Sequence, residues 1–326
     1  MAGASYMEVQ KAGGGIHYTV AKTKEASEEE LLDLLQDRLD RMLRAGTTLA
    51  EVKSGYGLTT EGELKLLRVL HQGASRTPIT LVPTFLGAHA VPPGLEPEAA
   101  TRLVIEEQLP AVVAARNRGE ISVSCVDVFC EAGVFSVDQT KRIVAEARKL
   151  GDLMVNVHVD ELAKLDGAKM AGELQAEAAS HCEEVSAAGI SAMRTGGTVA
   201  VLLPTTQMLL RLPAPPARDM IKQGVIVALG SDFNPNAFCL SMATVLHLAC
   251  VLLRLSPAEA LTAATLNAAH SVRRSHLHGA LQPGMRADML LIQAPRWEHL
   301  VYQLGEHHHL IHHVVCSGRV VYTKKE

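Results

Sequence analysis

The sequence lacks the features that would direct it into a membrane or a secretory pathway. Its first ten residues, MAGASYMEVQ, contain neither a basic segment nor an apolar core, so no signal peptide is expected. No uninterrupted apolar run approaches the ~18 residues that a membrane-spanning helix needs. None of the six cysteines forms a C-x-x-C pair, and their scatter is typical of a reducing compartment. We therefore expect a cytosolic protein without a membrane partner.

A basic stripe is missing as well, because acidic residues are interspersed with Lys and Arg along the chain. The net charge of -4 and the pI of 6.4 argue against a nucleic-acid partner and against an anionic membrane surface. What the chain does have is 326 residues that are 48% hydrophobic, which is enough for a large buried core.

Apolar segments typical of buried strands alternate with helical patterns along most of the chain. Their nearly continuous apolar character favours a parallel sheet covered by helices on both faces. An open doubly wound sheet fits this alternation, but polar residues at successive strand ends favour an α/β fold of the (β/α)8 TIM-barrel type. Seven strand segments begin near residues 48, 79, 122, 153, 177, 198 and 225.

Four helix starts carry the capping-box pattern, in which Ser or Thr precedes Glu or Gln by three positions. These starts are Ser27, Thr60, Ser136 and Ser256. The segment before Ser27 offers only a Gly-rich loop and a short IHYTV run, which we interpret as the exit of a missing strand. We therefore expect strands 2–8 of a barrel and no strand 1.

The end of the chain has a different pattern. Turn-bounded, β-branched segments such as LIHHVVCSGRVVYTKK predict a small β-sandwich module. The predicted division is an incomplete α/β barrel over residues 1–275 and the β module over residues 276–326.

Three residues suited to metal binding, His158, His181 and Asp232, each follow an apolar strand segment. If these strands are parallel neighbours, the three side chains converge at one edge of the sheet. Imidazoles and a carboxylate suit a single divalent metal ion, zinc or iron. Taken singly, each histidine has a more ordinary interpretation as a hydrogen-bonded surface or core residue, and Asp232 could form a turn. The joint pattern favours a metal-dependent hydrolase.

Eight sequence blocks occur in an order that resembles one family almost from end to end. The chain is similar to the amidohydrolase superfamily and, within it, to the imidazolonepropionase family. That resemblance implies hydrolysis of 4-imidazolone-5-propanoate to N-formimidoyl-L-glutamate, a step of histidine degradation. The blocks are EVKSGYGL, TFLGAHAVP, DVFCEAGVFS, NVHVDEL, LLPTT, SDFNPN, ATLNAAHSV and LQPGMRADML.

The resemblance also implies roles for individual residues. His158 and Asp232 would be metal ligands, and Asp232 would also handle a proton. His181 would orient or activate the attacking water, and Glu161 would assist proton transfer and contact the substrate ring.

Three further residues would bind the small-molecule substrate. Tyr56 and His89 would hold it, and Asn234 would hydrogen-bond the substrate or the product. His89 would also help to stabilise the negative charge that develops on the ring carbonyl oxygen. Tyr56 and His89 could instead simply pack at the barrel rim, and Glu161 could cap the following helix.

One part of the family pattern is absent from this sequence. The family has a His-x-His pair of metal ligands at the end of strand 1, and nothing in the first residues of this chain supplies them. A catalytically inactive shortened form is therefore an alternative, as is another cyclic amidohydrolase or a deaminase. Family members are commonly dimers, so a homodimer is possible.

Overall fold

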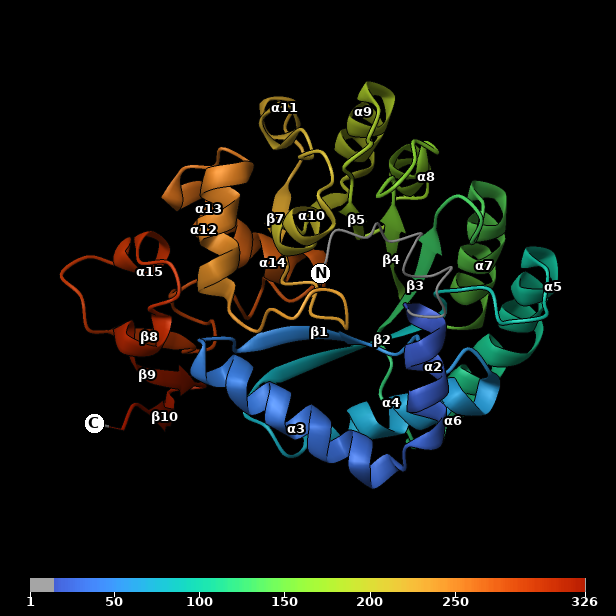
Figure 1. Ribbon diagram of the computed structural model, residues 1–326, viewed down its shortest axis with the longest axis horizontal. Helices are drawn as coiled ribbons and strands as arrows, with labels where there is room; N and C mark the ends of the chain where they lie inside the picture. The colour runs from blue at the N-terminus through green and yellow to red at the C-terminus, as the bar shows by residue number, and fades with distance from the viewer. Residues whose placement is uncertain (1–14, 326) are drawn as a thin grey trace.

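The computed structural model describes residues 15–325, in which the larger sheet has seven parallel strands (Figure 1). The strand order is β1-β2-β3-β4-β5-β6-β7, so every strand pairs with its neighbours in the sequence. A doubly wound sheet reverses its strand order, so this topology excludes that alternative and gives a half-barrel. The strands are β1 (Leu49–Lys53), β2 (Thr80–Ala88), β3 (Cys125–Cys130), β4 (Met154–Val159), β5 (Ala178–His181), β6 (Val199–Leu202) and β7 (Val227–Leu229).

Helices lie around the outside of this curved sheet (Figure 1). The long helices α3, α4 and α7 each begin with a Ser or Thr side chain that accepts a backbone N–H bond. The helices are α2 (Ile16–Glu25), α3 (Glu28–Arg44), α4 (Thr60–Ala74), α5 (Pro97–Arg102), the π-helical turn η1 (Leu103–Gln108), α6 (Leu109–Asn117), α7 (Val137–Leu150), α8 (Gly167–Glu173), α9 (Ala187–Gly196), α10 (Pro204–Leu210), α11 (Ala217–Lys222), α12 (Met242–Leu252), α13 (Pro257–Ala264) and α14 (Leu266–Ser271).

The main core lies between the strands and these helices. Side chains such as Phe85, Ile143 and Val157 are fully buried there. Burial of this kind contributes about 1.5–3 kcal/mol for each large apolar side chain. The strand segments predicted from continuous apolar runs are confirmed, since all seven begin within about three residues of the expected positions.

The C-terminal module is one antiparallel sheet of three strands in the order β10-β9-β8. The predicted β-sandwich is therefore wrong for the described residues. The apolar face of this sheet packs against helix α3, where Leu39 and Leu43 contact Ile311 and Val314, so a helix takes the place of a second sheet. The elements are β8 (Met289–Ile292), α15 (His299–Tyr302), α16 (His307–Leu310), β9 (Ile311–Cys316) and β10 (Arg319–Thr323). The boundary between residues 275 and 276 stays a prediction.

The segment before Ser27 also differs from the expectation. Residues 16–25 form helix α2 instead of an irregular strand exit. Its buried side chains, Ile16 and Val20, are one helical turn apart, and this short polar stretch has too few apolar residues to show a clear period. Residues 1–14, where the Gly-rich stretch begins, lie outside the described residues.

Three of the four capping boxes are confirmed, at Ser27, Ser136 and Ser256. The fourth is wrong by one residue, because Thr59 caps helix α4 by accepting the N–H of Gly62 at 3.2 Å. Glu63, the predicted partner in that box, is fully buried and turns toward the preceding loop. Tertiary burial of this carboxylate therefore overrides the local capping pattern.

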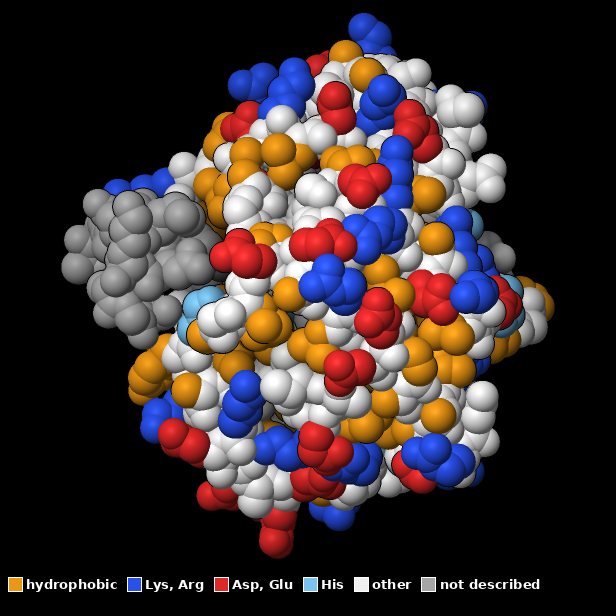
Figure 2. Space-filling model, turned by 90° about the vertical axis from the view of Figure 1, so that its right-hand side faces the viewer, with side chains coloured by type: hydrophobic (Ala, Val, Ile, Leu, Met, Phe, Trp, Pro, Cys, Tyr) orange, Lys and Arg blue, Asp and Glu red, His pale blue; other side chains and the backbone are white. Residues whose placement is uncertain are grey.

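The two ends of the larger sheet, β1 and β7, have no strand pairing with each other among the described residues. No helix in residues 15–325 is both long and apolar enough to cross a membrane. On the face drawn in Figure 2, Lys and Arg side chains are interspersed with Asp and Glu, as the sequence predicts.

Candidate active site and metal centre

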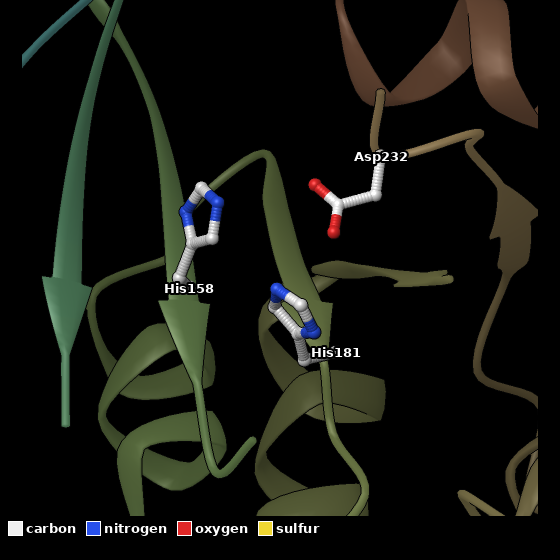
Figure 3. A group of neighbouring side chains, drawn as sticks. All are labelled: His158, His181 and Asp232. Carbon is white, nitrogen blue, oxygen red and sulfur yellow. The ribbon is translucent and has the colours of Figure 1, made fainter. Parts of the chain in front are cut away.

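Three side chains converge at the carboxyl end of the parallel strands. His158 lies near the end of β4, His181 is the last residue of β5, and Asp232 follows β7 by three residues. One ligand atom from each lies within 4.8 Å of the others, and the three point toward a common space (Figure 3). The β4–β5 register pairs Val159 with His181, so the two histidine positions are only one residue apart along the neighbouring strands. The predicted convergence is therefore observed.

The backbone at two of these positions is unusual for residues with a side chain. His181 has φ 76° and Asp232 has φ 47°, in the left-handed region. Such conformations cost about 1–3 kcal/mol each and persist where the surrounding structure enforces them. The Asp232 carboxylate accepts hydrogen bonds from the Thr206 hydroxyl and, at 3.1 Å, from the Asn234 side-chain amide. These contacts hold Asp232 at the site and place Asn234 directly beside it.

His158 is held by a second carboxylate. Its Nδ1 lies 3.0 Å from Oδ1 of Asp127, a fully buried residue of β3. Burial alone would lower the pKa of His158, but the charge and hydrogen bond of Asp127 raise it above the ordinary value. Burial opposes ionisation of Asp127 too, yet His158 and Lys53 together hold the pKa of Asp127 below its usual range.

His181 has a different environment. Burial and the neighbouring His158 lower the pKa of His181 far below its ordinary value, so the imidazole is neutral near pH 7. Its Nε2 lies 3.5 Å from Glu161, and its Nδ1 lies 3.8 Å from Glu183. His181 Nδ1 and both carboxylate oxygens of Glu183 are buried without a hydrogen-bond partner among the described residues.

The two carboxyl groups beside His181 have strongly shifted acidity. Burial and the nearby Asp232 raise the pKa of Glu161 to about 8. Burial and the nearby Glu161 raise the pKa of Glu183 to about 9. A site that combines unpaired imidazole nitrogen with buried acidic groups lacks positive charge, and a divalent cation would supply it. The donor set therefore fits the metal ion that the sequence predicts.

Tyr56 and His89 border the same space. Their rings are in edge contact with centroids 5.1 Å apart, and the His89 and His158 centroids are 6.4 Å apart. The Nδ1 atom of His89 lies 2.8 Å from the carbonyl oxygen of Gly55. Burial and the neighbouring His158 lower the pKa of His89 to about 4, so this imidazole is neutral near pH 7.

The loop that carries Tyr56 is organised by Glu63. The buried Glu63 carboxylate accepts the backbone N–H groups of Gly55, Gly57 and Leu58 at 2.8–2.9 Å. Helix α4 supplies this carboxylate to the loop. The contacts among the seven residues predicted for the site place them together around one rim of the sheet.

The comparisons with known proteins agree with this geometry. A sequence profile of the amidohydrolase family matches residues 38–321. A probable imidazolonepropionase of Nematostella vectensis is 52% identical over 325 residues, which cover 100% of this chain and 76% of that protein. The human protein described in the same words is 52% identical, covering 99% of this chain and 75% of its own.

This chain belongs to the imidazolonepropionase family of amidohydrolases. Solved structures share its fold at low identity. A zinc-bound adenosine deaminase from Xanthomonas campestris has a TM-score of 0.70 at 18% identity, covering 92% of this chain and 72% of its own. A zinc-complexed atrazine chlorohydrolase from Arthrobacter aurescens has a TM-score of 0.72 at 15% identity, covering 93% and 74%. At these identities the likeness shows the fold alone.

Several site residues were missed by sequence reasoning, above all Asp127, Lys53, Glu63 and Glu183. A signal for two of them is present, because Asp127 is a charged residue inside an otherwise apolar strand and Lys53 ends a strand that also contains Glu51. A charged side chain on a buried strand needs a partner of opposite charge. Residues on the same face of nearby strands can provide that partner. Glu63 and Glu183 have no such signal, since acidic residues at helix starts and after strands are normally solvated.

Proposed function

We propose that this chain carries the imidazolonepropionase fold and chemistry: hydrolysis of 4-imidazolone-5-propanoate to N-formimidoyl-L-glutamate in histidine degradation. The observation that carries the proposal is the convergence of His158, His181 and Asp232 beside Tyr56 and His89. Relatives that are named probable imidazolonepropionases match essentially the whole chain at about half identity, which supports the same assignment.

His158 and Asp232 would hold one divalent metal ion, and their chemistry suits zinc as well as iron. Such an ion, when bound, polarises a carbonyl oxygen and lowers the pKa of a nearby water toward ~7. The neutral His181 has an unprotonated nitrogen available to accept a hydrogen bond from that water and orient it. Asp232 takes up a proton and Glu161, whose pKa of about 8 keeps it largely protonated at neutral pH, returns a proton to the departing ring nitrogen.

His89 acquires a different role from the one expected. A carbonyl oxygen only accepts hydrogen bonds, so the Nδ1 of the neutral His89 donates to Gly55 and its Nε2 has no proton. Such a nitrogen cannot stabilise a developing oxyanion by donation. We assign it instead to accepting an N–H of the substrate ring, while Tyr56 and Asn234 supply further polar contacts.

The open ends of the strand order support one further proposal. An additional parallel strand between β7 and β1 would close the barrel and could carry the two further histidine ligands expected for the family.

The free cysteines, four of them buried, suit a reducing cytosol. A homodimer remains part of this proposal because it is common in the family.

The direct test is an assay of the purified full chain, loaded with zinc or with Fe²⁺ under anaerobic conditions, with mass spectrometry of the product. Formation of N-formimidoyl-L-glutamate supports the proposal. Ring opening of other cyclic amides, or ammonia release from a purine, would instead favour another amidohydrolase or a deaminase. Metal binding without turnover of any of these substrates would favour the catalytically inactive alternative.

A further inference from the structure

A chain of charged residues, buried at Asp127 and partly exposed at Lys53, runs behind His158 on the side away from the predicted metal. Asp127 is 0% exposed, and its two carboxylate oxygens have different partners. Oδ1 lies 3.0 Å from Nδ1 of His158, and Oδ2 accepts a hydrogen bond from Nζ of Lys53 at 2.8 Å. Both oxygens of a fully buried carboxylate are thus engaged, one on each side.

Lys53 is itself held in place. Its Nζ also donates to Oε1 of Glu51 at 2.6 Å. The same Glu51 oxygen accepts from the Thr84 hydroxyl at 2.7 Å and from the Asn156 side-chain amide at 2.9 Å. The network therefore joins strands β1, β2, β3 and β4, and the Lys53 ammonium has little freedom to move.

This arrangement determines which nitrogen of His158 carries the proton. A carboxylate only accepts hydrogen bonds, so the Nδ1 of His158 must donate to Asp127. The lone pair of the neutral imidazole then lies on Nε2, the only ring nitrogen left for a metal. Lys53 compensates the negative charge of Asp127, and its hydrogen bond to Oδ2 of Asp127 keeps that oxygen turned away from His158.

We propose that Lys53 and Asp127 are positioning residues that fix the tautomer and orientation of His158 for metal binding. The inference rests on the proposed metal centre, and it adds two residues that act on the ion through His158. In other metal sites, loss of such a partner of a ligating histidine weakens metal affinity by about 10–100-fold.

The structure predicts an unusual pattern for two variants. In Asp127→Asn, Lys53 attracts the amide oxygen, so the amide NH2 turns toward His158 and forces its proton onto Nε2. Zinc affinity should fall about 100-fold. In the double variant Asp127→Asn with Lys53→Met, that preference is gone and the amide oxygen can face His158 again. The double variant should therefore bind zinc about tenfold more tightly than Asp127→Asn alone.

The measurement is zinc affinity of the metal-free full chain, by competition with a chromophoric chelator, with circular dichroism as a check on folding. The matched control is Asp288→Asn, because Asp288 forms the same kind of pair with His278 at 3.1 Å, between the end of the barrel and strand β8. That control should leave zinc affinity unchanged. If Asp127→Asn does not fold, Lys53 variants decide: Lys53→Arg should bind zinc as the wild type does, and Lys53→Met should bind several-fold more weakly.

The outcomes separate the two levels of the proposal. A wild-type chain that binds no zinc would overturn the metal centre and the positioning role together. A wild-type chain that binds zinc, with Asp127→Asn or the Lys53 variants unchanged, would overturn the positioning role alone. Losses that simply add in the double variant would also contradict it, since a purely structural contribution of each residue predicts additivity.

Discussion

The two sides of the candidate site satisfy their buried polar groups in opposite ways. On the side of β1 and β2, the Glu63 carboxylate accepts three backbone N–H groups and the His89 Nδ1 bonds to Gly55. On the side of β5, His181 Nδ1 and both oxygens of Glu183 have no partner among the described residues. Buried polar groups are normally paired, so we expect a bound group to complete the second side.

This difference assigns the two sides different tasks. The loop that carries Tyr56 is held by hydrogen bonds within the protein, and in the proposed function it would offer the substrate a preformed surface. The side around His181 carries buried polar atoms without a partner among the described residues, which a folded chain tolerates where function requires it. We therefore expect substitutions on the β4, β5 and β7 side to act on metal binding and turnover, and those on the β1 and β2 side to act on substrate affinity.

The largest effect is expected for His158→Ala. The change removes a proposed ligand, and a metal ion contributes several kcal/mol to the transition state, so kcat/KM should fall by about a thousandfold or more. Zinc content measured by atomic absorption should fall in parallel. His71→Ala is the control, because His71 is bonded to the Ser122 hydroxyl outside the site. Retained zinc in His158→Ala would contradict its role as a ligand.

A smaller effect is expected for His181→Asn. Asn is chosen because it tolerates the left-handed backbone conformation of this position, φ 76°. Loss of the imidazole should lower kcat by about a hundredfold, within the usual range for a proton-handling group. Zinc affinity should change little, because His181 is proposed to act on water rather than to hold the ion. Zinc loss as large as in His158→Ala would make His181 a ligand and would remove this distinction.

On the other side, Glu63→Ala should raise KM about tenfold while zinc affinity stays the same. The variant removes the acceptor of three buried N–H groups, and unfolding free energy should fall by about 2–3 kcal/mol as the Tyr56 loop loses its support. Denaturant titration and steady-state kinetics measure the two effects. Glu61→Ala, at the exposed neighbour that bonds Arg68, is the control and should leave KM unchanged. Weaker zinc binding in Glu63→Ala would show that the two sides are not separable.

The smallest effect is expected for Tyr56→Phe. Loss of one hydroxyl contact to the substrate is worth about 1 kcal/mol, so KM should rise roughly fivefold with kcat nearly constant. The ring contact with His89 remains in this variant. A fall in kcat with unchanged KM would place Tyr56 in the chemistry and not in substrate binding.

Local sequence patterns were sufficient to predict the strands and most of the capped helix starts. Continuous apolar runs predict the strands because a parallel sheet is buried on both faces, and three Ser-initiated capping boxes predict helix starts. His158, His181 and Asp232 could be recognised because each lies at or just beyond the carboxyl end of such a strand. Helix α2 could not be predicted from the sequence, because its two buried side chains are too few to show a helical period within the polar sequence around them.

The sequence by itself determined which residues end the strands, and with them the ligand types available at one edge of the sheet. Only the tertiary structure decided how those residues are supported. The contact of Asp127 with His158 joins two different strands, β3 and β4. The contact of Glu63 with the Tyr56 loop forms because the Glu63 carboxylate is buried. A carboxylate has the same local sequence signature in solvent as in the core, and only packing removes it from water and forces it to find a partner.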